Sequence, residues 1–182
     1  MKTIQYIFNL FYYHIFLTAK AFNNSFNSLF LPLYRLKIMR RRCQKYGIED
    51  SYEWAKKRFE SENYPEQGIV IRESERLLYT WTITMLFAIG LIIIKIIKCF
   101  NSSFFDIILA SKLGFIGCFL MIMAITFFIT WIFSGRNHKY LIYFRFFENP
   151  DHRTKRKNRL LAWLIFLLSL GLAVFSFWLV SK

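Results

Sequence analysis

The chain has 182 residues, of which 55% are hydrophobic, and its mean hydropathy is positive. An ordinary soluble domain of this length would not shield that much apolar surface from water, so the composition argues against a soluble protein. The 25 Lys and Arg residues against 11 Asp and Glu give a formal net charge of +14, which predicts an anionic partner.

Residues 1–34 are expected to form an N-terminal membrane-embedded or interfacial helix. The apolar run over residues 3–22 is interrupted by four polar side chains, Gln5, Asn9, His14 and Lys20. The run lacks a small-x-small cleavage site, so we expect it to be retained. It is long enough to cross as a fourth span if Lys20 snorkels. Alternatively, the amphipathic spacing that follows, up to Pro32, places it in the membrane interface.

Residues 35–76 have the composition of a solvated segment, first basic and then mixed in charge. The basic part contains Arg35, Lys37, Arg40, Arg41, Arg42 and Lys45, with no acidic residue among them. Residues 51–62 predict a short helix that Asp50 or Ser51 caps, and the turn at Asn63 ends this helix. We expect the whole segment to be cytoplasmic.

Three apolar runs without a charged residue predict transmembrane helices, namely residues 77–94, 113–133 and 160–180, with 18, 21 and 21 residues. About 20 residues cross the hydrocarbon core at 1.5 Å per residue. Lipid leaves the backbone amides of such a run no partner outside the helix. The sequence therefore predicts an all-α integral membrane protein with three transmembrane helices within residues 77–182 and a basic cytoplasmic loop at residues 135–159.

The distribution of basic residues predicts the orientation in the membrane. Residues 35–76 carry 11 Lys and Arg, residues 136–159 carry 8, and two predicted spans separate the two segments. Lys and Arg in short loops stay on the cytoplasmic side, so both segments are expected there. The C-terminus is then outside, as in a bacterial inner membrane or its equivalent.

The basic residues beside the predicted spans are expected to bind anionic lipid headgroups. They are Arg35, Lys37, Arg40, Arg41, Arg42, Lys45, Arg153, Lys155, Arg156, Lys157 and Arg159. Five aromatic residues accompany the second set, namely Tyr140, Tyr143, Phe144, Phe146 and Phe147. Rings and cations together can bind single-stranded nucleic acid, but the same mixture is typical of a segment at headgroup depth, so nucleic acid is the disfavoured partner.

Ala110, Gly114 and Cys118 recur every four residues, which places three small side chains on one helix face. Small side chains let a second helix approach closely, and close packing holds helices together in lipid. We expect this face to take part in a homo-oligomer. Packing within one chain is an equal alternative.

Arg145 and His152 are separated by six residues, a spacing that resembles the Arg-x(4–6)-His motif of HEPN ribonucleases. The resemblance covers eight residues and implies that the arginine stabilises phosphate charge and the histidine transfers a proton. The sequence departs from the family where Phe146 follows the arginine and where Pro150 interrupts the helix. Small membrane accessory proteins of RNA-targeting CRISPR systems include HEPN-like examples.

The interior of the three predicted spans has no charged residue, which disfavours coupled transporters and proton pumps. No metal-ligand spacing and no cofactor motif is present. We therefore expect a non-enzymatic membrane component that acts by self-assembly or as a scaffold for a protein partner. One alternative is an oligomeric pore or membrane-disrupting effector, for example in microbial antiviral defence. Serine and threonine hydroxyls could line such a pore or could bond within their own helices. The third alternative is a membrane-bound HEPN-like nuclease.

Overall fold

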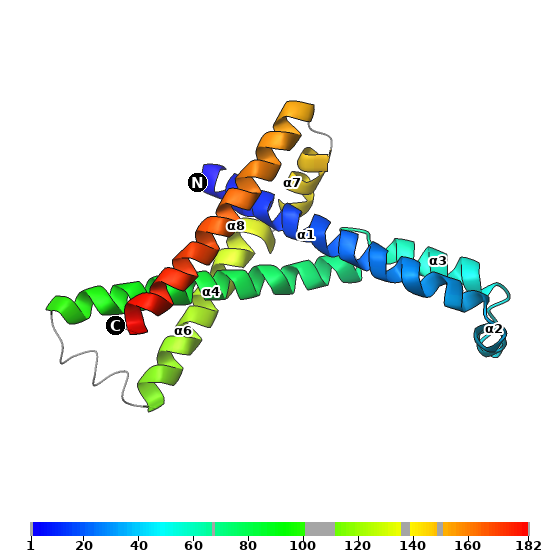
Figure 1. Cartoon of the computed structure of the whole chain (residues 1–182), viewed down its shortest axis with the longest axis horizontal. Coiled ribbons are helices and arrows are strands. Elements are labelled where there is room, and N and C mark those ends of the chain that lie inside the picture. The colour runs from blue at the N-terminus through cyan, green and yellow to red at the C-terminus, as the bar shows by residue number, and fades with distance from the viewer. Residues whose placement is uncertain (1, 67, 101–111, 136–138, 149–150, 182) are drawn as a thin grey trace. The chain divides into compact units, whose positions relative to one another are not determined.

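The computed structural model describes residues 2–66, 68–100, 112–135, 139–148 and 151–181, and every regular element among them is a helix (Figure 1). The elements are α1 (Lys2–Phe30), η1 (Leu31–Arg35), α2 (Lys37–Gln44), α3 (Ser51–Glu62), α4 (Ile69–Phe100), α6 (Lys112–Thr130), η2 (Trp131–Gly135), α7 (Lys139–Glu148) and α8 (His152–Ser181). Of these, η1 is a 3-10 helix and η2 a π-helix. The prediction of an all-helical protein is confirmed for the described residues.

Two helical stretches are long and apolar enough to cross a membrane, Ile69–Ile96 and His152–Leu179, each with 28 residues. They coincide with the runs predicted at residues 77–94 and 160–180. Only 17% of the most apolar window of each is buried, whereas the core helix of a soluble protein is mostly buried. The third predicted run lies on α6 and η2, where the apolar stretch Leu120–Phe133 is shorter than a span. A third crossing there, and a fourth by α1, stay predictions.

The chain forms two compact units. Unit 1 combines Met1–Phe11 with Leu77–Lys182, and unit 2 is Tyr12–Arg76. Helices α1 and α4 are therefore divided between the units, with one end of each helix in unit 1 and the other end in unit 2. The division before residue 77 coincides with the predicted start of the membrane region, whereas the second half of α1 belongs with the segment that we expect to be cytoplasmic.

The helices extend beyond the apolar runs into polar sequence. Helix α4 begins at Ile69 rather than at residue 77, and α8 begins at His152 rather than at residue 160. The described part of the predicted loop at residues 135–159 accordingly contains α7 and the first turns of α8. Apolar periodicity reports only the part of a helix that is shielded from water, so the polar turns at its ends carry no such signal.

Pro32 separates α1 from the rest of unit 2, as its position predicts. Helix α1 ends at Phe30, and Pro32 lies in the first turn of η1. A proline ring fixes φ and removes a backbone donor, which a first turn tolerates and a helix interior does not. The η1 helix then contacts α3, because Ser51 Oγ donates to the Tyr34 carbonyl at 2.6 Å.

Helix α2 ends at Gln44 and is followed by a hydrogen-bonded turn that contains Gly47. Gly47 has a φ of 75°, in the left-handed region. Its amide donates to the Gln44 carbonyl at 3.0 Å, and the Ile48 amide donates to the Cys43 carbonyl at 3.1 Å. These two bonds form a Schellman motif, in which glycine adopts the left-handed conformation without a Cβ clash. The sequence-based prediction lacks this helix, because its eight residues are shorter than the window of about 11 that periodicity needs.

Asp50 caps α3, as predicted, and the cap offers a test of this local structure. Its Oδ1 accepts from the backbone amides of Tyr52 at 2.9 Å and Glu53 at 3.1 Å. Asp50→Ala removes the acceptor and should lower the local opening free energy of α3 by about 1 kcal/mol. Hydrogen exchange at these two amides measures the loss, with Glu49→Ala as the matched control. Equal protection in the two variants would contradict the cap.

Candidate functional site

The helices of unit 1 bury hydroxyl side chains and expose large apolar ones. The buried hydroxyl residues on α4, α6 and α8 are Thr82, Thr126, Thr130, Ser169 and Ser176. The exposed apolar residues include Leu164, Leu168 and Phe175 on α8. A soluble protein, in contrast, buries most of the large apolar side chains of its long helices. The distribution in unit 1 suits helices that have lipid on their outer faces and close contacts through small side chains on their inner faces.

Six of the hydroxyl groups that could line a pore are bonded within their own helices. Each of the five buried ones donates to a carbonyl three or four residues earlier, at 2.6–3.0 Å. Thr84 donates in the same way to the Thr80 carbonyl at 2.9 Å. Their protons are therefore engaged, and the interpretation as intrahelical bonding is confirmed.

The buried residues of α8 form one stripe along the helix. They are Asn158, Ala162, Ser169 and Ser176, at intervals of four, seven and seven residues. Such intervals bring side chains to the same helix face. Because all four side chains are small or polar, α8 packs inside unit 1 through small groups and directs its bulky residues outward.

The first turns of α1 contact the π-helix η2 through polar side chains. Asn9 is fully buried, and its Nδ2 donates to the Phe133 carbonyl at 2.8 Å. The side-chain amide of Gln5 donates to the same carbonyl at 3.4 Å. The ring of Phe8 also lies 5.6 Å from that of Phe133. A π-turn departs from regular α-helical hydrogen bonding. In η2, the carbonyl of Phe133 accepts hydrogen bonds from two side chains of α1.

Tyr6 connects α1 with α7 and α8. Its hydroxyl donates to Asn158 Oδ1 at 3.1 Å, and its ring lies edge-on to Phe147 with the centroids 5.3 Å apart. Phe147 is buried, as are Tyr140 and Phe144. Three of the five aromatic residues considered for headgroups or nucleic acid therefore lie inside unit 1. Buried rings are not available to stack on bases.

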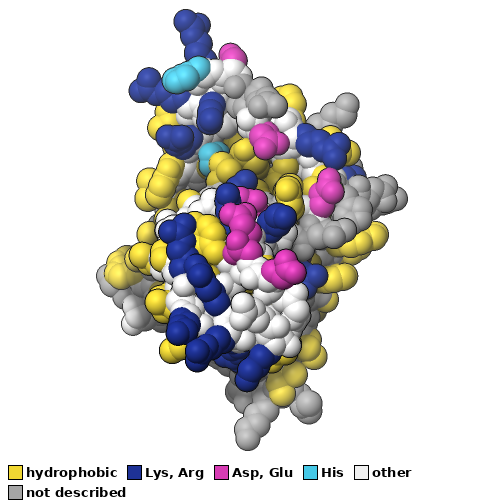
Figure 2. Space-filling model, turned by 90° about the vertical axis from the view of Figure 1, so that its right-hand side faces the viewer, with side chains coloured by type: hydrophobic (Ala, Val, Ile, Leu, Met, Phe, Trp, Pro, Cys, Tyr) yellow, Lys and Arg dark blue, Asp and Glu magenta, His cyan; other side chains and the backbone are white. Residues whose placement is uncertain are grey.

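The six predicted lipid-binding residues of unit 2 are all exposed. Arg35 ends η1, and the other five lie on α2 or directly after it. Figure 2 shows Lys and Arg side chains gathered on one face. The Arg35 guanidinium lies 4.2 Å from the centre of the Tyr52 ring, a cation–π contact that orients it. Residues 31–48 contain no acid, so this surface is strongly positive.

The five predicted lipid-binding residues of the second set lie in the first turns of α8, and all are exposed. Asp151 precedes them and caps the helix, with Oδ1 accepting from the Thr154 amide at 2.9 Å. Hydrogen bonds from the Thr154 side chain and amide hold the pKa of Asp151 below its ordinary value. A carboxyl whose pKa is lower in the folded than in the unfolded chain stabilises the folded state at pH values above its pKa in the unfolded chain. This contribution is lost as the pH falls through the lowered pKa.

Arg145 and His152 do not share a helix. Arg145 lies in the last turn of α7 and His152 is the first residue of α8, and both are exposed. The HEPN pattern would place both residues on one helix. No group of His, Cys, Asp and Glu among the described residues could hold a metal ion. A catalytic role for these two residues stays a prediction.

The predicted packing face is described only at Gly114. Ala110 lies outside the described residues, and the side chain of Cys118 on α6 is likewise not described. Two other glycines add to the picture: Gly117 on α6 and Gly171 on α8 are exposed and have no described atom within 4 Å of where a Cβ would lie. The apolar helices therefore carry glycines whose surroundings the same chain leaves open.

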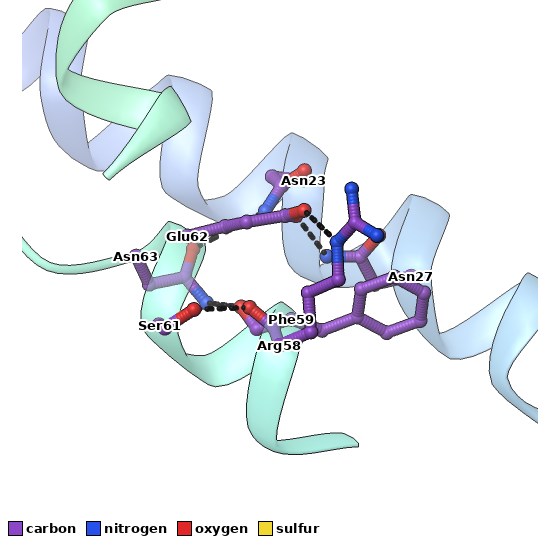
Figure 3. A network of polar contacts seen from close by, with 7 residues as sticks. All are labelled: Asn23, Asn27, Arg58, Phe59, Ser61, Glu62 and Asn63. Carbon is purple, nitrogen blue, oxygen red and sulfur yellow. Dashed lines mark hydrogen bonds and ion pairs between the residues drawn. The ribbon is translucent and has the colours of Figure 1, made fainter. Parts of the chain in front are cut away.

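A network of asparagines in unit 2 was not predicted (Figure 3). Asn63, at the end of α3, accepts from Asn23 Nδ2 at 3.4 Å. Its own Nδ2 donates to Asn24 Oδ1 at 2.7 Å. Buried Asn27 donates to the Glu62 carboxylate at 3.4 Å. The available signal was the spacing of Asn23 and Asn27, which are four residues apart and so lie on one helix face. These contacts hold α3 against the polar face of α1.

Comparisons of this chain with protein-family models, with curated proteins and with solved structures find no match. The function is therefore argued from the chemistry of the surfaces and contacts described above.

Proposed function

We propose that this protein is a non-enzymatic integral membrane component that self-assembles in the bilayer and supports a protein partner at its basic, cytoplasmic side. The observation that supports this most is the surface of α4, α6 and α8 in unit 1, where many large apolar side chains are exposed and several hydroxyl groups are buried. In water, such a surface would be an extended apolar patch that favours aggregation. In lipid, the same surface is solvated, and the small inner side chains permit close helix packing.

Both basic sets face the cytoplasmic leaflet in this proposal, and α4, α6 and α8 cross the bilayer, so that the C-terminus is outside. The exposure of all eleven basic side chains supports binding to anionic headgroups. Each Lys or Arg near such a surface contributes about 1 kcal/mol, which salt screens. In this proposal, the two basic sets determine the orientation of the spans in the bilayer.

Self-assembly is supported by Gly117 and Gly171. Glycine inside a helix costs about 1 kcal/mol relative to alanine, so an unpacked glycine weakens the isolated helix without any gain within the chain. A second copy whose helix lies against the glycine would supply that gain, because its backbone could approach closely and add dispersion and weak Cα–H contacts.

Gly117→Leu is expected to reduce the subunit number of the assembly in mild detergent. The added side chain meets no described atom of its own chain within 4 Å at its Cβ, so it should obstruct a neighbouring copy rather than the protomer fold. Gly114→Leu is also expected to reduce the subunit number, because a bulky side chain on the predicted packing face would keep a second helix from approaching closely. Native mass spectrometry or light scattering measures the mass.

Leu120→Ile is the matched control, because Leu120 is an exposed apolar residue of the same helix and the change conserves volume. The control should keep the full subunit number. A monomeric parent protein, or an unchanged mass in both glycine variants, would refute self-assembly through α6. A ring of many subunits would favour the alternative of an oligomeric pore, whereas a dimer would favour the scaffold.

A further inference from the structure

Unit 2 exposes an apolar ridge, formed by Phe22, Phe26, Leu29 and Phe30 in the second half of α1 and by Leu33 in η1. Phe22 and Leu29 are exposed by 74% and 73%, and Phe26 by 50%. The ring centroids of Phe26 and Phe30 are 4.4 Å apart, and those of Phe22 and Phe26 are 6.5 Å apart. The side chains of this apolar ridge thus contact one another along the helix while their outer surfaces remain open.

Helix α3 covers the asparagines of α1 rather than the apolar ridge. At about 100° per residue, the mean direction of Asn23 and Asn27 lies roughly a quarter of a turn from the mean direction of Phe22, Phe26, Leu29 and Phe30. Their contacts with the end of α3 hold that helix on the polar face (Figure 3). The outer side of α3 carries exposed charges, including Glu53, Lys56 and Glu60. Unit 2 therefore has a hydrated, charged helix on one face of α1 and an uncovered apolar ridge on another.

The apolar ridge continues directly into the most basic part of the chain. Pro32 ends α1, and η1 leads within a few residues to α2 with its exposed Lys and Arg. Exposed apolar side chains continue among these cations, with Leu36 at 53% and Ile38 at 78%. A surface that has exposed apolar side chains beside positive charges complements a bilayer, in which acyl chains lie directly beneath anionic headgroups.

We infer that the apolar ridge inserts into the acyl boundary of an anionic leaflet, with α2 on the headgroups, so that the second half of α1 runs along the membrane plane. An amphipathic helix in this position has its apolar face about 5–10 Å below the headgroup boundary. The asparagine contacts then direct α3 toward water. This membrane-surface role of unit 2 goes beyond self-assembly and is the same for a monomer as for an oligomer.

Spin-label depth in bilayer nanodiscs tests the inference on the full chain. Cys43, Cys99 and Cys118 are replaced by serine, and one nitroxide is attached through Phe22→Cys, Phe26→Cys or the control Glu60→Cys. Accessibility to oxygen and to a water-soluble nickel chelate gives the depth in mixed phosphatidylcholine and phosphatidylglycerol. The labels at positions 22 and 26 should share one depth within the leaflet, and the label at position 60 should lie in water. A crossing helix would instead separate positions 22 and 26 by about 6 Å in depth.

The outcomes separate lipid from the other occupants. Stepped depths at positions 22 and 26, water-like access at both, or exclusion of both reagents by a protein partner or a second copy would each overturn the inference. Combined Arg40→Gln, Arg41→Gln and Arg42→Gln should make both labels shallower in the anionic discs, and so should pure phosphatidylcholine. Equal depth under all three conditions would show that the charges are not involved. Because depth is measured independently of subunit number, failure of self-assembly leaves this test unaffected.

Discussion

Asn9→Leu is expected to lower the free energy of unfolding of the protein by about 0.5–1.5 kcal/mol, the net contribution of one hydrogen bond. Asn9 is fully buried, and its Nδ2 is the closer of the two side-chain donors to the Phe133 carbonyl, at 2.8 Å. Leucine has nearly the same size but no donor, which leaves this carbonyl only the longer bond from Gln5, at 3.4 Å. The carbonyl therefore keeps only the longer of its two side-chain bonds, and the variant loses the net stabilisation of the shorter one.

Asn9→Asp should be more damaging than Asn9→Leu. An ionised carboxylate cannot donate to the Phe133 carbonyl, and it places a negative charge beside that oxygen in a buried position. Thermal or denaturant unfolding in detergent, followed by circular dichroism, measures both variants. Thr18→Val is the matched control on α1, because Thr18 is exposed, and it should change stability by no more than about 0.5 kcal/mol. If Asn9→Leu matched this control, the contact between α1 and η2 would not stabilise the fold.

A reporter enzyme that is active only outside the cytoplasm should be active when it is fused after residue 182 and silent when it is inserted at residue 150. The reason is that 19 basic residues fall in two segments that two predicted spans separate. Both segments are therefore expected on the same side, and retention of Lys and Arg predicts that this side is the cytoplasm. The fusion after residue 182 should therefore be active and the insertion at residue 150 should have no activity above background. A cytoplasm-active reporter at the same two positions should give the complementary pattern.

Activity at residue 150 with silence at residue 182 would reverse the orientation. Activity at both positions, with silence of the cytoplasmic reporter, would show that α8 does not cross. The orientation also depends on charge, so replacing the five basic residues at the start of α8 by glutamine should weaken retention of that segment. Mixed activity at residue 150 in this variant would reflect loss of positive charge rather than of helix, because glutamine is a good helix former.

Much of the secondary structure follows from the sequence alone. Charge-free runs of about 20 residues predict helices, because in lipid only a helix bonds every backbone amide within one segment. This reasoning identified α4 and α8 but did not find their polar ends. The break at Pro32 and the cap at Asp50 were equally predictable, because each depends on the geometry of one residue and its immediate neighbours. Helix α2 was missed because it is short.

The candidate surfaces were predictable in composition but not in arrangement. The basic residues were identified from their number and their place beside the spans, and their binding to lipid stays a prediction. The ridge at Phe22 and Phe26 was visible as an amphipathic pattern. Which face of α1 would be covered was not predictable, because Asn23 and Asn27 could equally have faced water. Their contacts with the end of α3 join residues about forty positions apart, and no local rule specifies such a pairing.

The sequence by itself determined the all-helical character, the apolar stretches and the positive charge beside them, since these depend on local bonding and on composition. Only the tertiary structure decided how the polar residues are used. Asn9 is an interruption of an apolar run in the sequence, but in the fold it bonds to Phe133, 124 residues away. Arg145 and His152 are near neighbours in the sequence, but in the fold they belong to different helices. Hydrogen bonds between distant segments and the ends of helices depend on how the helices pack, and packing leaves no periodic signal in the chain.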